Sequence, residues 1–194
     1  MEKICFDINL KQDLLKKVSV TFLGKKLEYY TYPGVSSYKK THKGILYLAQ
    51  KLPDDLKPNK ILNVGCGNGI LSILASIKYP ESEIHAVDID PRAVALSIMN
   101  LSSNSRVTAW GSHNLDQIVD YDYSMILITI SSNCPEEIKE ILTQAYNHTR
   151  PEGVIYIFAE NLTLKSLQKP LQNIYGNAET EKRHKDYIIL SARK

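Results

Sequence analysis

The stretch Lys60–Gly69 places the tightest limit on how this chain can fold. A short apolar run, Ile61–Val64, ends in three alternating glycines, and the apolar segment Ile70–Ile77 follows. That order predicts a buried strand, a tight turn and the start of a helix, a βα unit that can cradle a nucleotide. A second apolar run ends at Asp88, nineteen residues after the last glycine. A carboxylate at that place can accept hydrogen bonds from two ribose hydroxyls.

Apolar runs typical of strands alternate with helical apolar spacing from Lys60 onward. Strands are expected at Ile61–Val64, Ile84–Asp88, Arg106–Trp110, Ser124–Thr129 and Val154–Phe158, with a closing pair at Ala178–Arg183 and Tyr187–Leu190. Helices are expected from Gly69 to about Tyr79, from Pro91 through Leu101, from Pro135 to the segment Arg150–Gly153, and over Leu164–Ile174, where Pro170 favours a kink. The alternation predicts an α/β fold with a mostly parallel sheet and an antiparallel finish.

The N-terminal part of the chain has a different pattern. Val18–Leu23 and Leu27–Tyr32 are rich in β-branched and aromatic residues and flank Gly24, which predicts a β-hairpin. Gly44–Leu52 has helical apolar spacing. Because 194 residues suffice for one full core, we expect a single domain over residues 1–194. Residues 1–58 would form a hairpin-and-helix extension, and residues 59–194 would form the binding core.

Composition and cysteine usage exclude several classes of protein. No apolar run approaches the ~20 residues that a membrane-spanning helix needs. The start of the sequence, Met1–Asp7, lacks the layout of a signal peptide. Cys5, Cys66 and Cys134 are odd in number and far apart, which indicates free thiols in a reducing compartment rather than disulfides or a zinc site. We therefore expect a cytoplasmic protein with no metal and no membrane partner.

Charge is unevenly distributed along the chain. Residues 1–60 hold twelve lysines and six carboxylates, whereas residues 61–194 carry a slight acidic excess. Tyrosines alternate with lysines in the basic part, at Tyr29, Tyr30, Tyr32 and Tyr38 and at Lys25, Lys26, Lys39, Lys40 and Lys43. Aromatic rings among cations suit stacking on bases and contact with phosphates. The other interpretation is a half-exposed hairpin with a solvated lysine face.

The glycine spacing separates two kinds of nucleotide ligand. A dinucleotide-binding fingerprint has its last glycine one position later, where this chain has Ile70. A nicotinamide-dependent oxidoreductase is therefore disfavoured. A tight turn without any ligand is the simplest alternative, but one glycine would be enough to make such a turn.

The segments Ile61–Gly69 and Ala86–Val94 resemble the S-adenosylmethionine-binding core of class I methyltransferases. More narrowly, they are similar to the methyltransferase small-domain family, which includes ribosomal-RNA guanine-N2 methyltransferases. The segments Gly24–Lys40 and Ile174–Leu190 are similar to the family's pre-core segment and closing strands, so the resemblance covers roughly residues 22–194. It implies a Rossmann-like fold with a mostly parallel seven-stranded sheet, an antiparallel C-terminal pair and an N-terminal β-hairpin.

The resemblance also implies roles for individual residues. The turn at residues 65–69 would approach the methionine part of the cofactor, Asp88 would hold the ribose hydroxyls, and Ile89 would lie against the adenine. Ser112 and His113 occupy the positions of adenine contacts, and Gly34–Ser37 would flank the methyl-transfer pocket. The implied cofactor-binding set is Gly34, Ser37, Gly65, Cys66, Gly67, Asn68, Gly69, Asp88, Ile89, Ser112 and His113.

Three positions depart from the family pattern. Asn63 and His113 stand where the family has Asp, so a charge before the glycines and an acceptor near the adenine are lost. The third is the largest: Thr129, Ile130 and Ser131 stand where the family has Asn-Pro-Pro. An alignment shifted along the chain would instead use Asn133, followed by Cys134 and Pro135.

These departures bear on catalysis, because such an enzyme mainly aligns the nucleophile with an already activated methyl group. The candidates for that alignment are the Thr129 hydroxyl, the Ile130 carbonyl and Asn133. A structural role for Ser131–Asn133 as a helix cap competes with a catalytic one. We expect an S-adenosylmethionine-dependent methyltransferase acting on RNA, with no DNA partner. The alternative is a catalytically impaired relative that binds cofactor, RNA or a protein partner.

Overall fold

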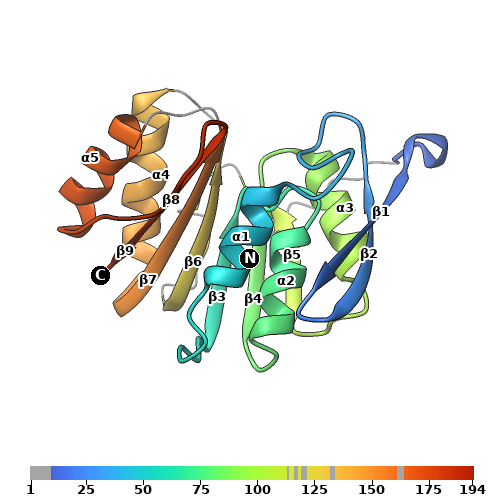
Figure 1. Ribbon diagram of the computed structural model, residues 1–194, viewed down its shortest axis with the longest axis horizontal. Helices are drawn as coiled ribbons and strands as arrows, with labels where there is room; N and C mark the ends of the chain where they lie inside the picture. Colours follow the sequence, from blue (N-terminus) through green and yellow to red (C-terminus); the bar gives the residue numbers. More distant parts are fainter. Residues whose placement is uncertain (1–9, 113, 116–117, 119–121, 132–133, 161–163) are drawn as a thin grey trace.

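The computed structural model describes residues 10–194 except 113, 116–117, 119–121, 132–133 and 161–163 (Figure 1). The strands are β1 (Lys16–Phe22), β2 (Lys25–Thr31), β3 (Lys60–Val64), β4 (Glu83–Asp88), β5 (Val107–Gly111), β6 (Tyr123–Ile130), β7 (Thr149–Glu160), β8 (Glu179–Arg183) and β9 (Tyr187–Arg193). The helices are the 3-10 turn η1 (Gln12–Leu14), α1 (Lys43–Lys51), α2 (Ile70–Lys78), α3 (Pro91–Leu101), α4 (Pro135–His148) and α5 (Leu164–Tyr175).

A seven-stranded sheet forms the centre of the molecule, with strand order β5-β4-β3-β6-β7-β9-β8. The first five strands in that order are parallel, and β9 and β8 pair antiparallel. Figure 1 shows helices on both sides of the sheet, with α4 and α5 together on one side. The central strands β3 and β6 are rich in apolar residues and buried over almost their whole length, because both of their faces are covered. This is the α/β Rossmann-like methyltransferase fold that the resemblance implied.

The strand order reverses between β3 and β6, since β4 follows β3 on one side and β6 joins it on the other. Ligands of such sheets bind outside the carboxyl ends of the strands at this point. Val64, Asp88, Ile130 and Glu160 are the last residues of β3, β4, β6 and β7, so they meet at this edge. The fold thereby brings four distant segments to one place.

The hairpin β1–β2 forms a small sheet of its own and packs beside α3. Its core side chains are Phe22 and Tyr29, both about 1% exposed. Asn100 at the end of α3 binds the hairpin backbone: its Oδ1 accepts from the Tyr30 N–H at 2.7 Å, and its Nδ2 donates to the Tyr30 carbonyl at 2.8 Å. The same Nδ2 donates to the Asn68 carbonyl at 2.8 Å. The hairpin is thus tied to the glycine turn, and the loop after it reaches the sheet edge.

The structure corrects two element boundaries. The segment Arg150–Gly153 was expected to end a helix, but α4 ends at His148 and this segment lies inside β7. It is extended because it pairs with the end of the chain: the Glu152 N–H donates to the Lys194 carbonyl, and the Lys194 N–H donates to the Gly153 carbonyl. The N-cap of α4 is Cys134, with no side-chain capping bond, rather than a residue of the segment 131–133.

Pro170 lies inside α5, which runs through it as one helix. No described helix is long and apolar enough to cross a membrane.

Candidate functional site

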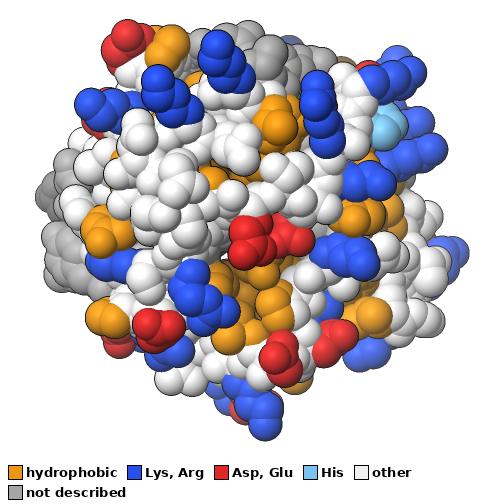
Figure 2. All heavy atoms as spheres, turned by 60° about the vertical axis from the view of Figure 1, so that its left-hand side comes forward, with side chains coloured by type: hydrophobic (Ala, Val, Ile, Leu, Met, Phe, Trp, Pro, Cys, Tyr) orange, Lys and Arg blue, Asp and Glu red, His pale blue; other side chains and the backbone are white. Residues whose placement is uncertain are grey.

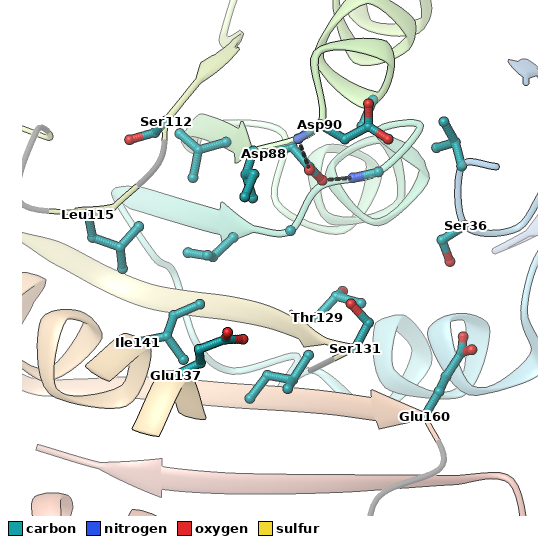
Figure 3. Close-up of a pocket in the computed structure, with 18 of the residues that line it drawn as sticks. Ser36, Asp88, Asp90, Ser112, Leu115, Thr129, Ser131, Glu137, Ile141 and Glu160 are labelled. Atoms are coloured by element: carbon teal, nitrogen blue, oxygen red, sulfur yellow. Dashed lines mark hydrogen bonds between the residues drawn. The ribbon is translucent and has the colours of Figure 1, made fainter. Parts of the chain in front are cut away.

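A cavity of about 810 Å³ opens at the carboxyl ends of the parallel strands (Figure 3). This volume lies within the range of small-molecule and cofactor sites. Its described lining comes from the loop after β2, the ends of β3, β4, β6 and β7, the segment after β5, and α4. Of the cofactor-binding residues predicted from sequence, the cavity is lined by Gly34, Ser37, Gly65, Gly67, Asp88, Ile89 and Ser112.

The glycine turn exposes bare backbone to the cavity. Gly65 and Gly67 have φ values of +68° and +58°, in the left-handed region that favours glycine. A Cβ atom at Gly65 would lie 2.6 Å from the Thr129 carbonyl oxygen. At Gly67 the nearest atom would be the Ser36 Cβ, at 3.9 Å. At position 65 a side chain would collide with β6, so only glycine fits. At position 67 there is room for a side chain, and glycine is favoured only by the positive φ.

Asp88 at the end of β4 is held by two backbone donors. The Gly67 N–H donates to Oδ2 at 2.8 Å, and the Asp90 N–H donates to Oδ1 at 2.9 Å. Burial raises the pKa of this carboxyl above its ordinary value, while these hydrogen bonds act in the opposite direction. Each carboxylate oxygen retains a second lone pair. The side chain can therefore accept two more hydrogen bonds from the cavity, as a ribose diol requires.

Beyond Asp88 the cavity offers an apolar surface and an unsatisfied acceptor. Ile89 is 64% exposed at the cavity wall. Asn114 also lines the cavity, and its Oδ1 is buried without a hydrogen-bond partner in the described part of the chain. The Ser112 hydroxyl donates to the Asn114 backbone carbonyl at 2.5 Å, which fixes this segment. A flat heterocycle with an amino group would cover Ile89 and satisfy Asn114, so adenine fits this end.

Three residues of the predicted cofactor set support the turn and do not line the cavity. The Cys66 thiol is buried 3.3 Å from the Ser97 Oγ, and burial raises its pKa. Asn68 donates from Nδ2 to the Ser36 carbonyl at 3.1 Å and accepts from the Ile70 N–H at Oδ1. Gly69 packs against α3, where an added Cβ would lie 3.0 Å from the Ser97 Oγ. These three residues therefore stabilise the turn through contacts outside the cavity.

At the other end of the cavity lie the candidates for aligning a nucleophile. Thr129, Ile130 and Ser131 at the end of β6 line the wall, and Figure 3 shows Thr129 and Ser131 between Asp88 and Glu160. Asn133 and His113, predicted for catalysis and for adenine contact, lie outside the described residues. Pro135 begins α4, one residue after its N-cap Cys134. The end of β6 therefore presents Thr129–Ser131, not Pro135, to the cavity.

Sequence reasoning missed a histidine–carboxylate pair at this end. Glu160 is the last residue of β7, and its Oε1 lies 3.8 Å from the His42 Nε2. The His42 Nδ1 accepts the Gly44 N–H at 3.0 Å, which leaves Nε2 to carry the ring hydrogen toward Glu160. The ring packs against Phe158 and Tyr187, at centroid distances of 5.1 and 5.4 Å. The available sequence signal was the position of Glu160, directly after an apolar strand.

The cavity is strongly acidic. Its described lining contains no lysine or arginine, and its carboxylates are Asp88, Asp90, Glu137, Glu140 and Glu160. Asp90 is paired with Arg92, whose guanidinium lies 2.7 Å away and holds the pKa of Asp90 below its usual value. Glu137 and Glu140, which sequence reasoning treated as helix-surface charges, face the cavity from α4. Such a lining favours a ligand that carries positive charge.

Asn63 and Tyr29 lie in the interior of the protein and do not face a ligand site. Asn63 is fully buried in β3, and its Nδ2 donates to the Ser72 Oγ at 2.8 Å, so its departure from the family pattern lies behind the cavity. Tyr29 is core rather than a stacking surface, with its hydroxyl 2.7 Å from the Thr41 Oγ1. Tyr30 is 38% exposed, and the Lys17 Nζ lies 5.7 Å from its ring centroid.

Comparison with known proteins finds one family over most of the chain. The family model for the methyltransferase small domain matches residues 26–191. A "Ribosomal RNA small subunit methyltransferase C" from Psychromonas ingrahamii is 24% identical over 186 residues, covering 91% of this chain and 51% of that protein. The protein of the same name from Pseudomonas paraeruginosa is 34% identical over 91 residues, covering 47% of this chain and 27% of that protein. The chain thus spans about half the length, or less, of the curated relatives it matches.

Solved structures show the same fold. A T. thermophilus 16S rRNA methyltransferase in complex with AdoMet and guanosine superposes with a TM-score of 0.76 at 20% identity, covering 93% of this chain and 51% of that one. A precorrin-6y C5,15-methyltransferase from Geobacter metallireducens gives a TM-score of 0.64 at 20% identity, covering 84% of this chain and 92% of that one. With the family model matching most of its length, the chain belongs to the methyltransferase small-domain family.

Proposed function

We propose that this chain binds S-adenosylmethionine in the cavity and transfers its methyl group to an RNA. The observation that carries the proposal is the Asp88 carboxylate, which two backbone N–H groups aim into a cavity at the strand-order reversal. That arrangement matches a ribose diol. The adenine would lie toward Ile89 and Asn114, and the methionine part would lie along the Gly65–Gly67 backbone.

Charge supports the choice of cofactor. S-adenosylmethionine carries a sulfonium and an ammonium group, and the cavity is lined by five carboxylates with no described lysine or arginine. Opposite charge raises the local concentration of such a ligand. The sulfonium supplies an activated methyl group, so the chain's own task is to align the nucleophile.

Groups at the ends of β6 and β7 would align the nucleophile with the methyl group. The Thr129 hydroxyl and the Ile130 carbonyl can accept hydrogen bonds from an amine or a hydroxyl nucleophile. Asn133 remains a candidate on sequence grounds alone. Glu160 faces the same space, and its carboxylate can accept a proton from the nucleophile as the methyl group is transferred, leaving a neutral carboxyl group. The His42 ring, 3.8 Å away, would hold the Glu160 side chain in place. RNA as acceptor is supported by the relatives that carry the name of a ribosomal RNA methyltransferase.

The second candidate is binding without catalysis, which is favoured by the replacement of the family's Asn-Pro-Pro by Thr129, Ile130 and Ser131. Two measurements separate the candidates. Calorimetry with S-adenosylhomocysteine tests the cofactor site, and absence of binding would refute it. Transfer of labelled methyl from S-adenosylmethionine to total RNA, protein and small-molecule fractions tests catalysis. Label in RNA supports the proposal, whereas binding without transfer to any fraction establishes the second candidate.

A further inference from the structure

We infer that the groove between α5 and β8 is a second binding site, which holds the phosphodiester backbone of an RNA whose base enters the cavity. The inference rests on the proposed function and adds to it the surface that the polymer contacts. It also places the RNA contact away from the hairpin, although the alternating tyrosines and lysines of the sequence suggested a contact there.

The groove has a volume of about 520 Å³ and a basic, amide-rich lining. The described residues that form it are Leu164, Lys165, Gln168, Lys169, Gln172 and Arg183. The lysines and glutamines follow helical spacing and so share one face of α5, while Arg183 faces them from the end of β8. Three cations with two amide groups among them match the donors that hold nucleic-acid phosphates and sugars.

The cations of this groove are free of internal partners. In the described part of the chain, no carboxylate lies within 4 Å of the Lys165, Lys169 or Arg183 cationic groups. The described groove lining itself contains no aspartate or glutamate. On the hairpin, Lys17 pairs with Glu28 at 3.0 Å, whereas Lys16, Lys25 and Lys26 have no carboxylate within 4 Å in the described chain. The position beside the acceptor end of the cavity therefore distinguishes the groove from the hairpin. Unpaired cations retain their full capacity to displace counterions from a phosphate backbone.

The groove lies next to the acceptor end of the cavity. Arg183 pairs with Ile188, and Ile188 pairs with Ala159, so the three residues form one row across β8, β9 and β7. Two strand spacings put the Arg183 backbone about 10 Å from that of Ala159. The next residue, Glu160, lines the cavity, and α5 begins four residues after it. A base held near Glu160 therefore leaves its own strand within reach of the groove.

The two sites have opposite charge, which assigns a place to each part of the RNA. Phosphates are repelled from a cavity lined by Asp88, Glu137, Glu140 and Glu160 in addition to the Arg92-paired Asp90, whereas an uncharged base is not. Figure 2, which brings the side of α4 and α5 forward, shows lysine and arginine side chains spread around this face, at the upper left as well as the upper right, with a group of carboxylates near its centre. The geometry accordingly separates the base, in the acidic cavity, from the backbone, in the basic groove.

The test uses the full chain and two charge-matched variants. The groove variant carries Lys165→Gln, Lys169→Gln and Arg183→Gln. The control variant carries Lys16→Gln, Lys25→Gln and Lys26→Gln, which removes three exposed hairpin cations that have no carboxylate within 4 Å in the described chain. Affinity for a short single-stranded RNA is measured by fluorescence anisotropy over a series of salt concentrations, with S-adenosylhomocysteine affinity measured in parallel.

We expect the groove variant to lose about tenfold or more in RNA affinity and to reduce the slope of log K against log salt by about 2, since each released contact on a single strand contributes about 0.7. Its affinity for S-adenosylhomocysteine should match that of the wild type. The control should keep the wild-type slope. Loss of slope in the control alone, equal loss in both variants, or absence of RNA binding by the wild type would overturn the inference.

A competition arm separates the polymer from a small anion. Inorganic phosphate should displace the RNA only at concentrations where added chloride of equal ionic strength does the same, and displacement well below that point would show an anion site and overturn the inference. The proposed function fails on different readouts, namely cofactor binding or methyl transfer. If the groove variant lowers the salt slope but the wild type transfers no methyl group, catalysis is refuted and the groove remains an RNA contact.

Discussion

The two halves of the cavity are built in different ways. The donor half, from Gly65 to Asp88, comes from two consecutive βα units and works through backbone: φ values above zero, and N–H groups that orient one carboxylate. The acceptor half combines the ends of β6 and β7 with the start of α1 and works through side chains. Backbone geometry is tightly constrained, whereas side chains at strand ends can be exchanged without changing the fold. Under the proposed function, the donor half would hold the cofactor and the acceptor half would hold the group that is methylated.

The largest effect should come where the halves touch. Gly65→Ala places a Cβ 2.6 Å from the Thr129 carbonyl at a φ of +68°, so backbone must move on one side or the other. Steric overlap and the left-handed conformation together should lower the free energy of unfolding by about 3 kcal/mol, as measured by urea denaturation.

Gly67→Ala is the matched control, because its Cβ meets only the Ser36 Cβ at 3.9 Å. It should cost about 1 kcal/mol, from conformation alone. Equal costs for the two variants would show that the contact between the halves is not a constraint.

The next largest effect concerns the donor half alone. Asp88→Ala removes the carboxylate that we propose accepts two hydrogen bonds from the ribose, and it releases the Gly67 and Asp90 N–H groups. Affinity for S-adenosylhomocysteine should fall more than tenfold, since hydrogen bonds to a charged group contribute about 1.5–3 kcal/mol each. Calorimetry measures it, with Glu140→Ala, another lining carboxylate, as the control. Similar losses in both variants would mean that net charge, rather than ribose contact, explains binding.

Glu160→Gln tests the acceptor half without touching the donor half. If the carboxylate receives a hydrogen from the nucleophile, the turnover number should fall by about tenfold, a modest factor because alignment supplies most of the rate. Affinity for S-adenosylhomocysteine should stay at the wild-type value. A parallel loss of cofactor affinity would remove the distinction between the halves at this residue.

His42→Asn should have a smaller effect than Glu160→Gln. Asn keeps an acceptor for the Gly44 N–H at the start of α1 and removes the ring next to Glu160. Turnover should decrease, and thermal unfolding should stay close to that of the wild type. A large drop in stability with unchanged turnover would assign His42 to the helix cap alone.

The smallest effect should be the pH dependence of the donor half. Burial raises the folded-state pKa of Asp88, so its contribution to stability is greatest below the unfolded-state pKa and is lost as pH rises through the folded-state value. Cofactor binding has the opposite sign, because the ribose hydroxyls bind the ionised carboxylate. S-adenosylhomocysteine affinity should therefore weaken several-fold as pH falls toward that pKa. Asp88→Asn should bind more weakly with a flatter profile over the same range, and an unchanged slope would point to another group.

Sequence reasoning predicted most of the fold, and it predicted the glycine turn and the strand-end aspartate that line the cavity, because these features depend on local signals. The glycine spacing, the apolar runs and the acid after a strand are each read within a few residues, and β3 and β4 begin within one residue of expectation. Cys66, Asn68 and Gly69, also predicted to bind the cofactor, do not line the cavity, and their role stays a prediction. The direction of a side chain in a turn depends on φ values that letters alone do not supply.

Sequence reasoning predicted fewer of the residues in the acceptor half, since their contacts depend on how distant segments pack together. Glu160 meets His42 because α1, which His42 caps, packs against β7 and β9. Asn114 was missed because its unsatisfied oxygen is a property of packing, not of sequence. The Arg150–Gly153 error has the same origin: pairing with the end of the chain overrode local turn signals.

The amide of Asn100, which bonds both the Tyr30 backbone and the Asn68 carbonyl, joins the hairpin to the cofactor turn through one side chain. We expect this shared side chain to couple the order of the hairpin to the order of the turn. A ligand that orders the turn should also slow hydrogen exchange of the β2 amides, and Asn100→Ala should confine that protection to the turn. Binding of the cofactor would then change the dynamics of the hairpin, which the cofactor does not contact.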